Sequence, residues 1–181
     1  MDAKQKYDMP SEVRTVITNV DTGDHITLQF EPQVITSSVA ANYNSDPAIG
    51  GTHENMMFSH TSNETFSLEL RWNRIIQTAL RGWTTERADK MIEDHQAFIR
   101  SLVSPISIAE DIIGGDTPLV NVNVPGVCNV MCKLINIDRE VPRRDPQTGS
   151  IMELTMRCTF KEDPRYRYSS DDIFNAGYKR N

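Results

Sequence analysis

The chain has 181 residues, of which 38% are hydrophobic and 24% are charged, a composition that suits one folded globular domain with short appendages. Its formal net charge of -6 at pH 7 disfavours a surface that neutralises nucleic-acid phosphates, so we expect no specific nucleic-acid binding. No long apolar run follows Met1, and we therefore expect neither a secretion signal nor membrane insertion.

The N-terminal part is predicted to hold an arm followed by a hairpin. Residues 1–12 are mostly polar and form the predicted arm. Residues 13–20 and 25–30 are rich in β-branched or alternating apolar side chains, and Asp21-Thr22-Gly23-Asp24 between them favours a tight turn. We therefore expect two antiparallel strands here.

A long polar loop is predicted after residue 43. An extended stretch over residues 33–43 leads into it, and the loop contains Asp46-Pro47, Gly50-Gly51 and an apolar spot formed by Met56, Met57 and Phe58. Loops of this length are usually functional, so these three apolar residues are candidate partner-binding residues.

A strand and a long helix are predicted in the middle of the chain. Residues 65–72 alternate strictly, which indicates a half-buried strand with one apolar face: Phe66, Leu68, Leu70 and Trp72. Apolar residues then recur at helical spacing over residues 85–103, with Thr84 or Thr85 as the cap. Ser104-Pro105 ends this helix and could begin a short second helix that runs to Ile113.

The second half is predicted to be a β-meander. Three strands are expected, over residues 119–124, 127–138 and 150–161. The last two are joined by a polar connection over residues 139–149, which we expect to protrude from the sheet.

Together these elements predict an α+β fold in which one long helix packs on an antiparallel, sandwich-like or barrel-like sheet. The domain is predicted to cover residues 13–162, with a C-terminal arm over residues 163–181. Sheet edges that the chain leaves open should be charged, covered or paired with another chain. The apolar faces predict a shared core of Leu68, Leu70, Met152, Leu154, Met156 and Phe160 with Phe98 and Leu102 of the helix.

No group of residues has the spacing of a catalytic or cofactor site, so we expect neither enzyme activity nor a bound cofactor. His53, Glu54 and His60 could in principle bind a metal, but such loop residues are usually solvated, and no metal site is predicted. The three cysteines lack CxxC spacing and are expected to be reduced thiols in the core: Cys128, Cys132 and Cys158.

Arginine and tyrosine gather in two places. Arg143 and Arg144 lie in the predicted connection, and the C-terminal arm contains Arg165, Tyr166, Arg167, Tyr168 and Tyr178. These residues could form a nucleic-acid patch, but neighbouring aspartates dilute its charge, and Arg with aromatic residues is also enriched at protein interfaces. We therefore predict that they contact protein partners.

The order of four segments carries a resemblance to a known family. They are Phe30–Tyr43, the strand Thr65–Trp72 followed by a helix, the Pro-containing Thr117–Val122, and Gly149 before an alternating strand that ends near Glu162. In this order they resemble the tube-protein-like domain of contractile phage tails and related injection systems, especially the baseplate adaptor or tube-initiator proteins. Two features depart from the pattern: Pro125-Gly126-Val127 stands where the family often has Trp-Gly, and no LysM-like module follows the domain in these residues.

The resemblance implies a structural subunit that forms a ring at the junction of hub and tube, where it initiates or extends the inner tube. It further implies a homo-oligomer, hexameric in this family, with tail tube, hub and baseplate proteins as partners, located in the virion tail after assembly in the host cytoplasm. DNA would pass through its channel, so Arg143, Arg144, Arg165 and Arg167 should point toward protein partners and away from the lumen.

Other interpretations stay open at this point. The chain could be a tail-tube subunit or a neck ring protein, which would change its station but not its class. From other classes, it could be a monomeric β-barrel that binds a ligand or a cell-wall fragment, or an enzyme whose residues are not recognised.

Overall fold

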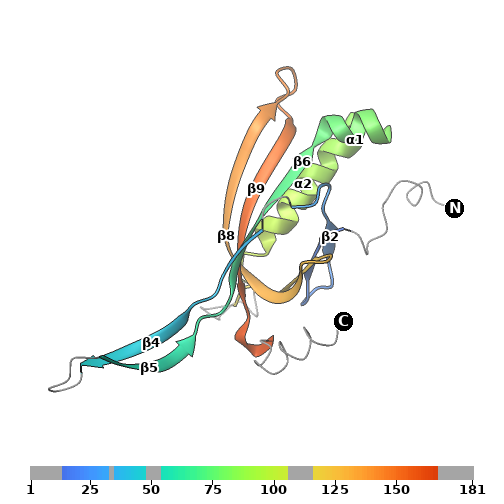
Figure 1. Ribbon diagram of the computed structural model, residues 1–181. Helices are drawn as coiled ribbons and strands as arrows, with labels where there is room; N and C mark the ends of the chain where they lie inside the picture. The colour runs from blue at the N-terminus through green and yellow to red at the C-terminus, as the bar shows by residue number, and fades with distance from the viewer. Residues whose placement is uncertain (1–13, 33–34, 48–53, 106–115, 167–181) are drawn as a thin grey trace.

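The computed structural model describes residues 14–32, 35–47, 54–105 and 116–166 (Figure 1). The elements in chain order are β1 (Val16–Asn19), β2 (His25–Thr27), β3 (Ile35–Ser38), β4 (Ala41–Pro47), β5 (Glu54–Thr61), β6 (Thr65–Asn73), α1 (Arg74–Arg81), α2 (Thr85–Ser101), β7 (Val120–Val124), β8 (Cys128–Arg144), β9 (Ile151–Glu162) and the 3-10 turn η2 (Pro164–Tyr166).

The described strands form one large sheet and one small ribbon. The large sheet has seven antiparallel strands in the order β2-β1-β7-β8-β9-β6-β3, and the ribbon is the pair β4–β5. The predicted hairpin at the N-terminus is confirmed as β1–β2, and the predicted meander is confirmed as β7-β8-β9.

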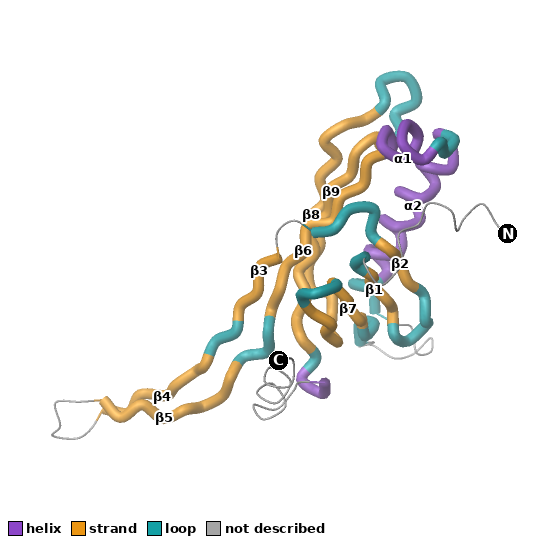
Figure 2. Tube along the Cα trace, turned by 45° about the vertical axis from the view of Figure 1, so that its right-hand side comes forward, coloured by secondary structure: helices purple, strands orange, loops and turns teal. Residues whose placement is uncertain are grey.

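Helix α2 lies against the large sheet, with β1 and β2 to one side of it and β6 and β9 to the other (Figures 1 and 2). The apolar cluster joins both sides: Ile17 and Val122 belong to the same core as Leu70 and Met156, and Ile92 and Ile99 of the helix complete it. The predicted α+β class, with a long helix packed on an antiparallel sheet, is therefore confirmed.

The predicted core is correct except at two positions. Leu68, Leu70, Leu154, Met156, Phe160 and Leu102 are each at most 1% exposed. Phe98 is half-buried and packs against the rim of the core, whereas Met152 is half-buried outside it. Met152 lies at the start of β9, where the pairing with β8 shifts register and Ile151 packs against the core in its place, so its assignment to the shared core was wrong. Cys132 and Cys158 do lie in the core, and burial raises the pKa of the Cys158 thiol to about 12.

Two predicted loops are instead largely strands. The polar segment after residue 43 is mostly the ribbon β4–β5, and β8 continues to Arg144 through much of the predicted connection over residues 139–149. Most of their described side chains are exposed, with Asn42, Thr61 and Val141 partly buried, so both segments lack the alternation of buried and exposed residues that reveals a half-buried strand. The predicted short helix ending at Ile113 and the N-terminal arm lie outside the described residues.

Helix α1 was not predicted. Asn73 caps its start by accepting the backbone N–H of Ile76 at 3.2 Å, and Gly82 ends it in the left-handed conformation with φ of 63°. Its buried residues are Arg74 and Gln77, both polar, whereas the apolar Ile75 and Leu80 are exposed. The helix has only eight residues, which is too short a stretch for a helical period to be recognised in the sequence.

A buried guanidinium joins both helices to the tip of the β8–β9 hairpin. Arg74 Nη1 lies 3.3 Å from Asp89 of α2 and donates to the Ser150 hydroxyl at 2.7 Å, while Nη2 donates to Asp145 at 2.8 Å. The Asp145 carboxylate also accepts two backbone N–H groups of the hairpin turn. The Arg74 hydrogen bond, with those two, lowers the pKa of Asp145 to about 2.

The first prediction concerns the core. Leu154 is fully buried between β6 and the helices, and we expect Leu154→Ala to lower the free energy of unfolding by about 2 to 5 kcal/mol because it leaves a cavity. Urea denaturation of the variant and the wild-type chain measures this. A loss of no more than about 0.5 kcal/mol, the usual size for a surface substitution, would contradict the described register of β9.

The second prediction concerns acid. The pKa of Asp145 is lowered to about 2 from an ordinary 3.8, so its contribution to stability is complete above about pH 4 and disappears as the pH falls through about 2. Asp163 behaves in the same way, because hydrogen bonds from Arg165 lower its pKa to about 2. We expect Asp145→Asn to reduce the drop in unfolding free energy between pH 4 and pH 2, and the double variant with Asp163→Asn to reduce it further. Urea denaturation at pH 4 and pH 2 measures these free energies. Equal drops in the wild type and both variants would count against both ion pairs.

Candidate assembly surface

The ribbon β4–β5 projects from the body of the molecule (Figures 1 and 2). It leaves the body beyond β3 and the start of β6. There the Ser62 N–H donates to the Ala40 carbonyl, and the Ala40 N–H donates to the Ser62 hydroxyl oxygen. An isolated two-stranded ribbon is marginally stable in water, and it normally needs a further strand or a packing surface. Within the described part of the chain, the ribbon has neither.

The ribbon carries exposed apolar side chains on the part that projects. Tyr43 pairs with Phe58 across the strands, and their rings meet edge to face with centroids 5.8 Å apart. Tyr43 is 53% exposed, Met57 63% and Phe58 59%. The side chain of Met56 lies outside the described residues. Met57 and Phe58 are exposed, as residues that contact a partner are expected to be in the free subunit. Tyr43 was missed by sequence reasoning, because only the strand register brings it beside Phe58.

A second feature is the open edge of β8. Strand β7 pairs with β8 only as far as Cys132, so in the described chain no strand covers that side of β8 from Leu134 to Arg144. One hydrogen bond shows to which side the backbone groups of β9 point. The Glu162 N–H donates to the Glu64 carbonyl, so the N–H and C=O groups of every second residue before Glu162, including Cys158 and Met156, also point toward β6. The β8 residues paired with Cys158 and Met156 therefore point their backbone N–H and C=O groups away from β9.

Those partners are Ile137 and Arg139. Their backbone N–H and C=O groups point to the open edge, where another strand could bind them. The exposed charged residues along this part of β8 include Asp138, Arg139, Glu140, Arg143 and Arg144. Mixed charge of this kind keeps an edge strand soluble and selects a partner of complementary charge.

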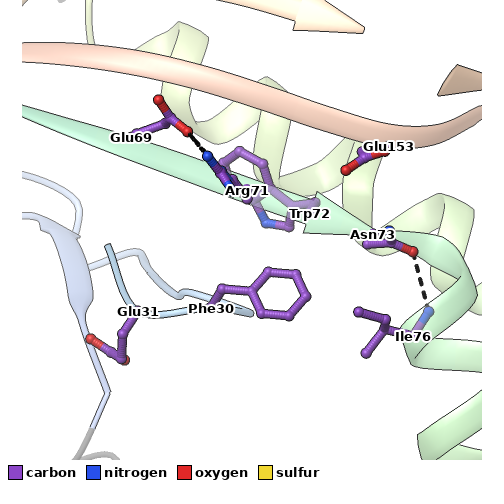
Figure 3. A pocket seen from close by; sticks show the side chains of 8 residues that line it. All are labelled: Phe30, Glu31, Glu69, Arg71, Trp72, Asn73, Ile76 and Glu153. Atoms are coloured by element: carbon purple, nitrogen blue, oxygen red, sulfur yellow. Dashed lines mark hydrogen bonds and ion pairs between the residues drawn. The ribbon is translucent and has the colours of Figure 1, made fainter. Parts of the chain in front are cut away.

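The opposite edge of the slab that β8, β9 and β6 form, along β6, is also only partly paired in the described chain. Strand β3 pairs with β6 only from Thr65 to Leu68, and at the other end Asn73 exchanges two hydrogen bonds with the side-chain amide of Gln29. Between these points no strand of the described chain pairs with β6, and Glu69 and Arg71 line a cavity of about 260 Å³ together with Phe30 and Glu31. The Phe30 ring points into that cavity between Trp72 and Ile76 (Figure 3).

The predicted arginines are distributed over different places. Arg143 and Arg144 lie at the end of β8 and are exposed, and Arg144 Nε donates to the Gly149 carbonyl across the hairpin turn at 3.2 Å. Arg165 forms an intrachain pair with the buried carboxylate of Asp163, with Nη2 and Oδ2 2.6 Å apart, although 65% of its side chain stays exposed. The Tyr166 side chain and residues Arg167, Tyr168 and Tyr178 lie outside the described set, so their partner contacts stay a prediction.

The described residues show no constellation that suggests another chemistry. Within ranges 14–32, 35–47, 54–105 and 116–166, no three His, Cys, Asp or Glu side chains are placed to hold a metal ion. His53 and the Glu54 side chain, two of the three residues considered above as possible metal ligands, lie outside the described residues. Of the described helices, neither has the length and apolar character needed to cross a membrane.

Comparisons with known proteins give little further guidance. No known protein family matches the sequence, and no curated protein matches it. One solved structure that resembles the chain is described as the tail of an empty GTA particle computed with helical refinement in C6 symmetry. The TM-score is 0.40 at 9% identity, over 90% of this chain and 99% of that one. That likeness is too slight to carry an argument, and the proposals below rest on the chain's own residues.

The third prediction concerns the ribbon. Phe58 is exposed and distant from the core, so we expect Phe58→Ser to change the free energy of unfolding of the isolated chain by no more than about 0.5 kcal/mol. The same substitution should weaken association with other subunits, because it removes an exposed aromatic contact. Thermal unfolding and sedimentation velocity measure the two effects. Ser59→Ala, next to it on the ribbon, is the matched control, and equal association of both variants would argue against the ribbon as a contact surface.

Proposed function

We propose that this chain is a structural subunit of a contractile phage tail that closes into a ring at the junction of hub and tube and initiates or extends the inner tube. A tail-tube or neck ring is the alternative station. The order of the sequence motifs supports the tail assignment, and the arrangement of the sheet supports assembly through strand edges.

One observation carries the proposal of assembly: in the described chain, the strands β8, β9 and β6 form a slab, and each of its two outer edges has a stretch with which no strand pairs. One edge presents the backbone of Ile137 and Arg139, and the other presents the backbone of Glu69 and Arg71 beside the short β3. Two different open edges allow copies to join head to tail by one repeated contact, and such a contact produces a ring when its rotation closes. The sheet would then continue from subunit to subunit.

The ribbon supports the same proposal from another part of the molecule. Its exposed Tyr43, Met57 and Phe58 lie far from the slab, so a ring joined through the slab leaves them free to bind a neighbouring ring or a hub protein (Figures 1 and 2). A monomeric ligand-binding module gives no role to either feature. It would rely on a concave apolar pocket, whereas the cavity beside Phe30 has charged walls formed by Glu31, Glu69 and Arg71.

The fourth prediction tests edge pairing. The backbone N–H of Arg139 points to the open edge, so Arg139→Pro removes a donor that β9 does not use and places the proline ring where an added strand would lie. We expect the variant to fold but to remain near 20.5 kDa under conditions in which the wild-type chain forms rings. Light scattering after size exclusion gives the mass, and negative-stain electron microscopy shows the rings.

Arg139→Ala is the matched control, because it removes the same side chain and keeps the N–H. It should assemble as the wild type does. If Arg139→Pro forms rings as readily as Arg139→Ala, the β8 edge is not the joint. A wild-type chain that stays monomeric at high concentration, both alone and with tail components, would contradict the proposed function itself.

A further inference from the structure

Helix α1 presents apolar side chains to solvent and polar side chains to the interior. Its buried residues are Arg74 and Gln77, whereas Ile75 is 39% exposed and Leu80 is 78% exposed. A helix on the surface of a globular protein normally has the reverse arrangement. Large apolar side chains gathered on an exposed face mark a surface that another protein can cover.

The exposed apolar residues of α1 share one face of the helix. Ile75 and Ala79 are four positions apart, which places them one above the other. Ile76 and Leu80 have the same spacing and lie beside them. Ile76 is half-buried, and the other three side chains are exposed. We call this face the α1 stripe: Ile75, Ile76, Ala79 and Leu80.

Ion pairs hold the helix in this orientation. Arg74 lies on the opposite face of α1, and its guanidinium binds Asp89 of α2 and Asp145 at the tip of the β8–β9 hairpin. Rotating the helix to turn the α1 stripe inward would break both pairs and leave a buried charge without partners. The stripe is therefore fixed in place as a surface for a partner.

The α1 stripe and the ribbon β4–β5 lie at opposite ends of the molecule (Figures 1 and 2). The ribbon exposes Tyr43, Met57 and Phe58. Copies stacked in the same orientation along this direction would bring the ribbon of one copy to the α1 end of the next. Exposed apolar surface at one end would then cover exposed apolar surface at the other.

The charges at the two ends are complementary. Residues 41–61, which include the ribbon, contain Asp46 and Glu54 and neither Lys nor Arg. Helix α1 contains neither Asp nor Glu, and the adjoining hairpin tip exposes Arg143 and Arg144 at the end of β8. Complementary charge of this kind selects one docking partner over others.

We propose that the ribbon of one copy docks on the α1 stripe of a copy in the next ring, so that successive rings stack through this contact. The inference rests on the proposed function, because it requires rings. A single contact of this kind is much smaller than the roughly 800 Å² per partner of a stable pair of proteins. Between two rings it repeats once for each subunit, and the repeated contacts act together.

Engineered cysteines in the full chain test the contact directly. A chain with both Met57→Cys and Leu80→Cys is assembled into stacked rings and oxidised, and non-reducing gel electrophoresis shows how many chains are linked. We expect a ladder longer than dimers, because each copy offers one thiol to the ring above and one to the ring below. Either substitution alone, and the wild-type chain with its three native cysteines, should give no such ladder.

Leu80→Gln tests the α1 stripe without engineered thiols. We expect its rings to need at least about tenfold higher concentration to stack, as seen by sedimentation velocity and negative-stain electron microscopy. Lys90→Gln, at an exposed position of α2, is the matched control and should stack as the wild type does. Combining Leu80→Gln with Phe58→Ser should weaken stacking little more than the stronger single variant, because both residues would belong to one contact.

The outcomes separate this contact from the proposed function. If rings stack but Leu80→Gln behaves as Lys90→Gln does, or if the double cysteine variant gives no ladder, the ribbon does not dock on α1, although the ring assignment stands. Fully additive losses in the combined variant would place Phe58 and Leu80 in different contacts and overturn the pairing. In the isolated chain, a Leu80→Cys thiol that reacts with maleimide as slowly as the buried Cys158 would show that the chain covers its own stripe, which would also overturn the proposal. A wild-type chain that forms no rings would instead contradict the proposed function.

Discussion

Strand β8 has 17 residues, whereas β7, which pairs with its start, has 5. The backbone groups of β8 beyond Cys132 therefore have no partner on that side in the described chain. Unpaired groups in water cost little, but a row of them is a template for another strand. On the other side of the same slab β3 is short, and in the described chain no strand pairs with β6 at Glu69 and Arg71. The proposed mode of assembly thus depends on the difference in length between neighbouring strands.

The overhanging ends of β8 and β9 need support that the sheet does not give, and Arg74 supplies part of it. Its guanidinium holds Asp145 and Ser150 at the tip and Asp89 on α2, so the hairpin is tied to the helices by charged hydrogen bonds. Removing one partner would leave a buried charge unpaired. Pairing between the strand edges of two subunits depends on the angle at which the strands meet. The hydrogen bonds of Arg74 lie outside this contact, yet they can determine whether it forms because they hold the hairpin at its angle.

The sequence was sufficient to predict the elements with an amphipathic pattern. Helix α2 begins at the predicted Thr85, and β6 and β9 lie where alternation placed them. Helix α1 was not predicted because it has only eight residues, too few for a helical period to be recognised. The ribbon was not predicted because most of its described side chains are exposed, which removes the alternation. At the candidate site, Met57 and Phe58 could be chosen as apolar residues in a polar segment. Tyr43 could not, since only the strand register brings it beside Phe58.

The two unlike open edges have a consequence for how a ring would complete. An arc of n copies contains n-1 joints and always ends in one bare β8 edge and one bare β6–β3 edge, whatever its size. Closure adds the last joint within a single particle, where the effective concentration of the two ends far exceeds that of free subunits. Incomplete arcs should therefore be short-lived, and subunits should be found either free or in complete rings. The angle at one joint would then fix the number of subunits without any separate measuring device.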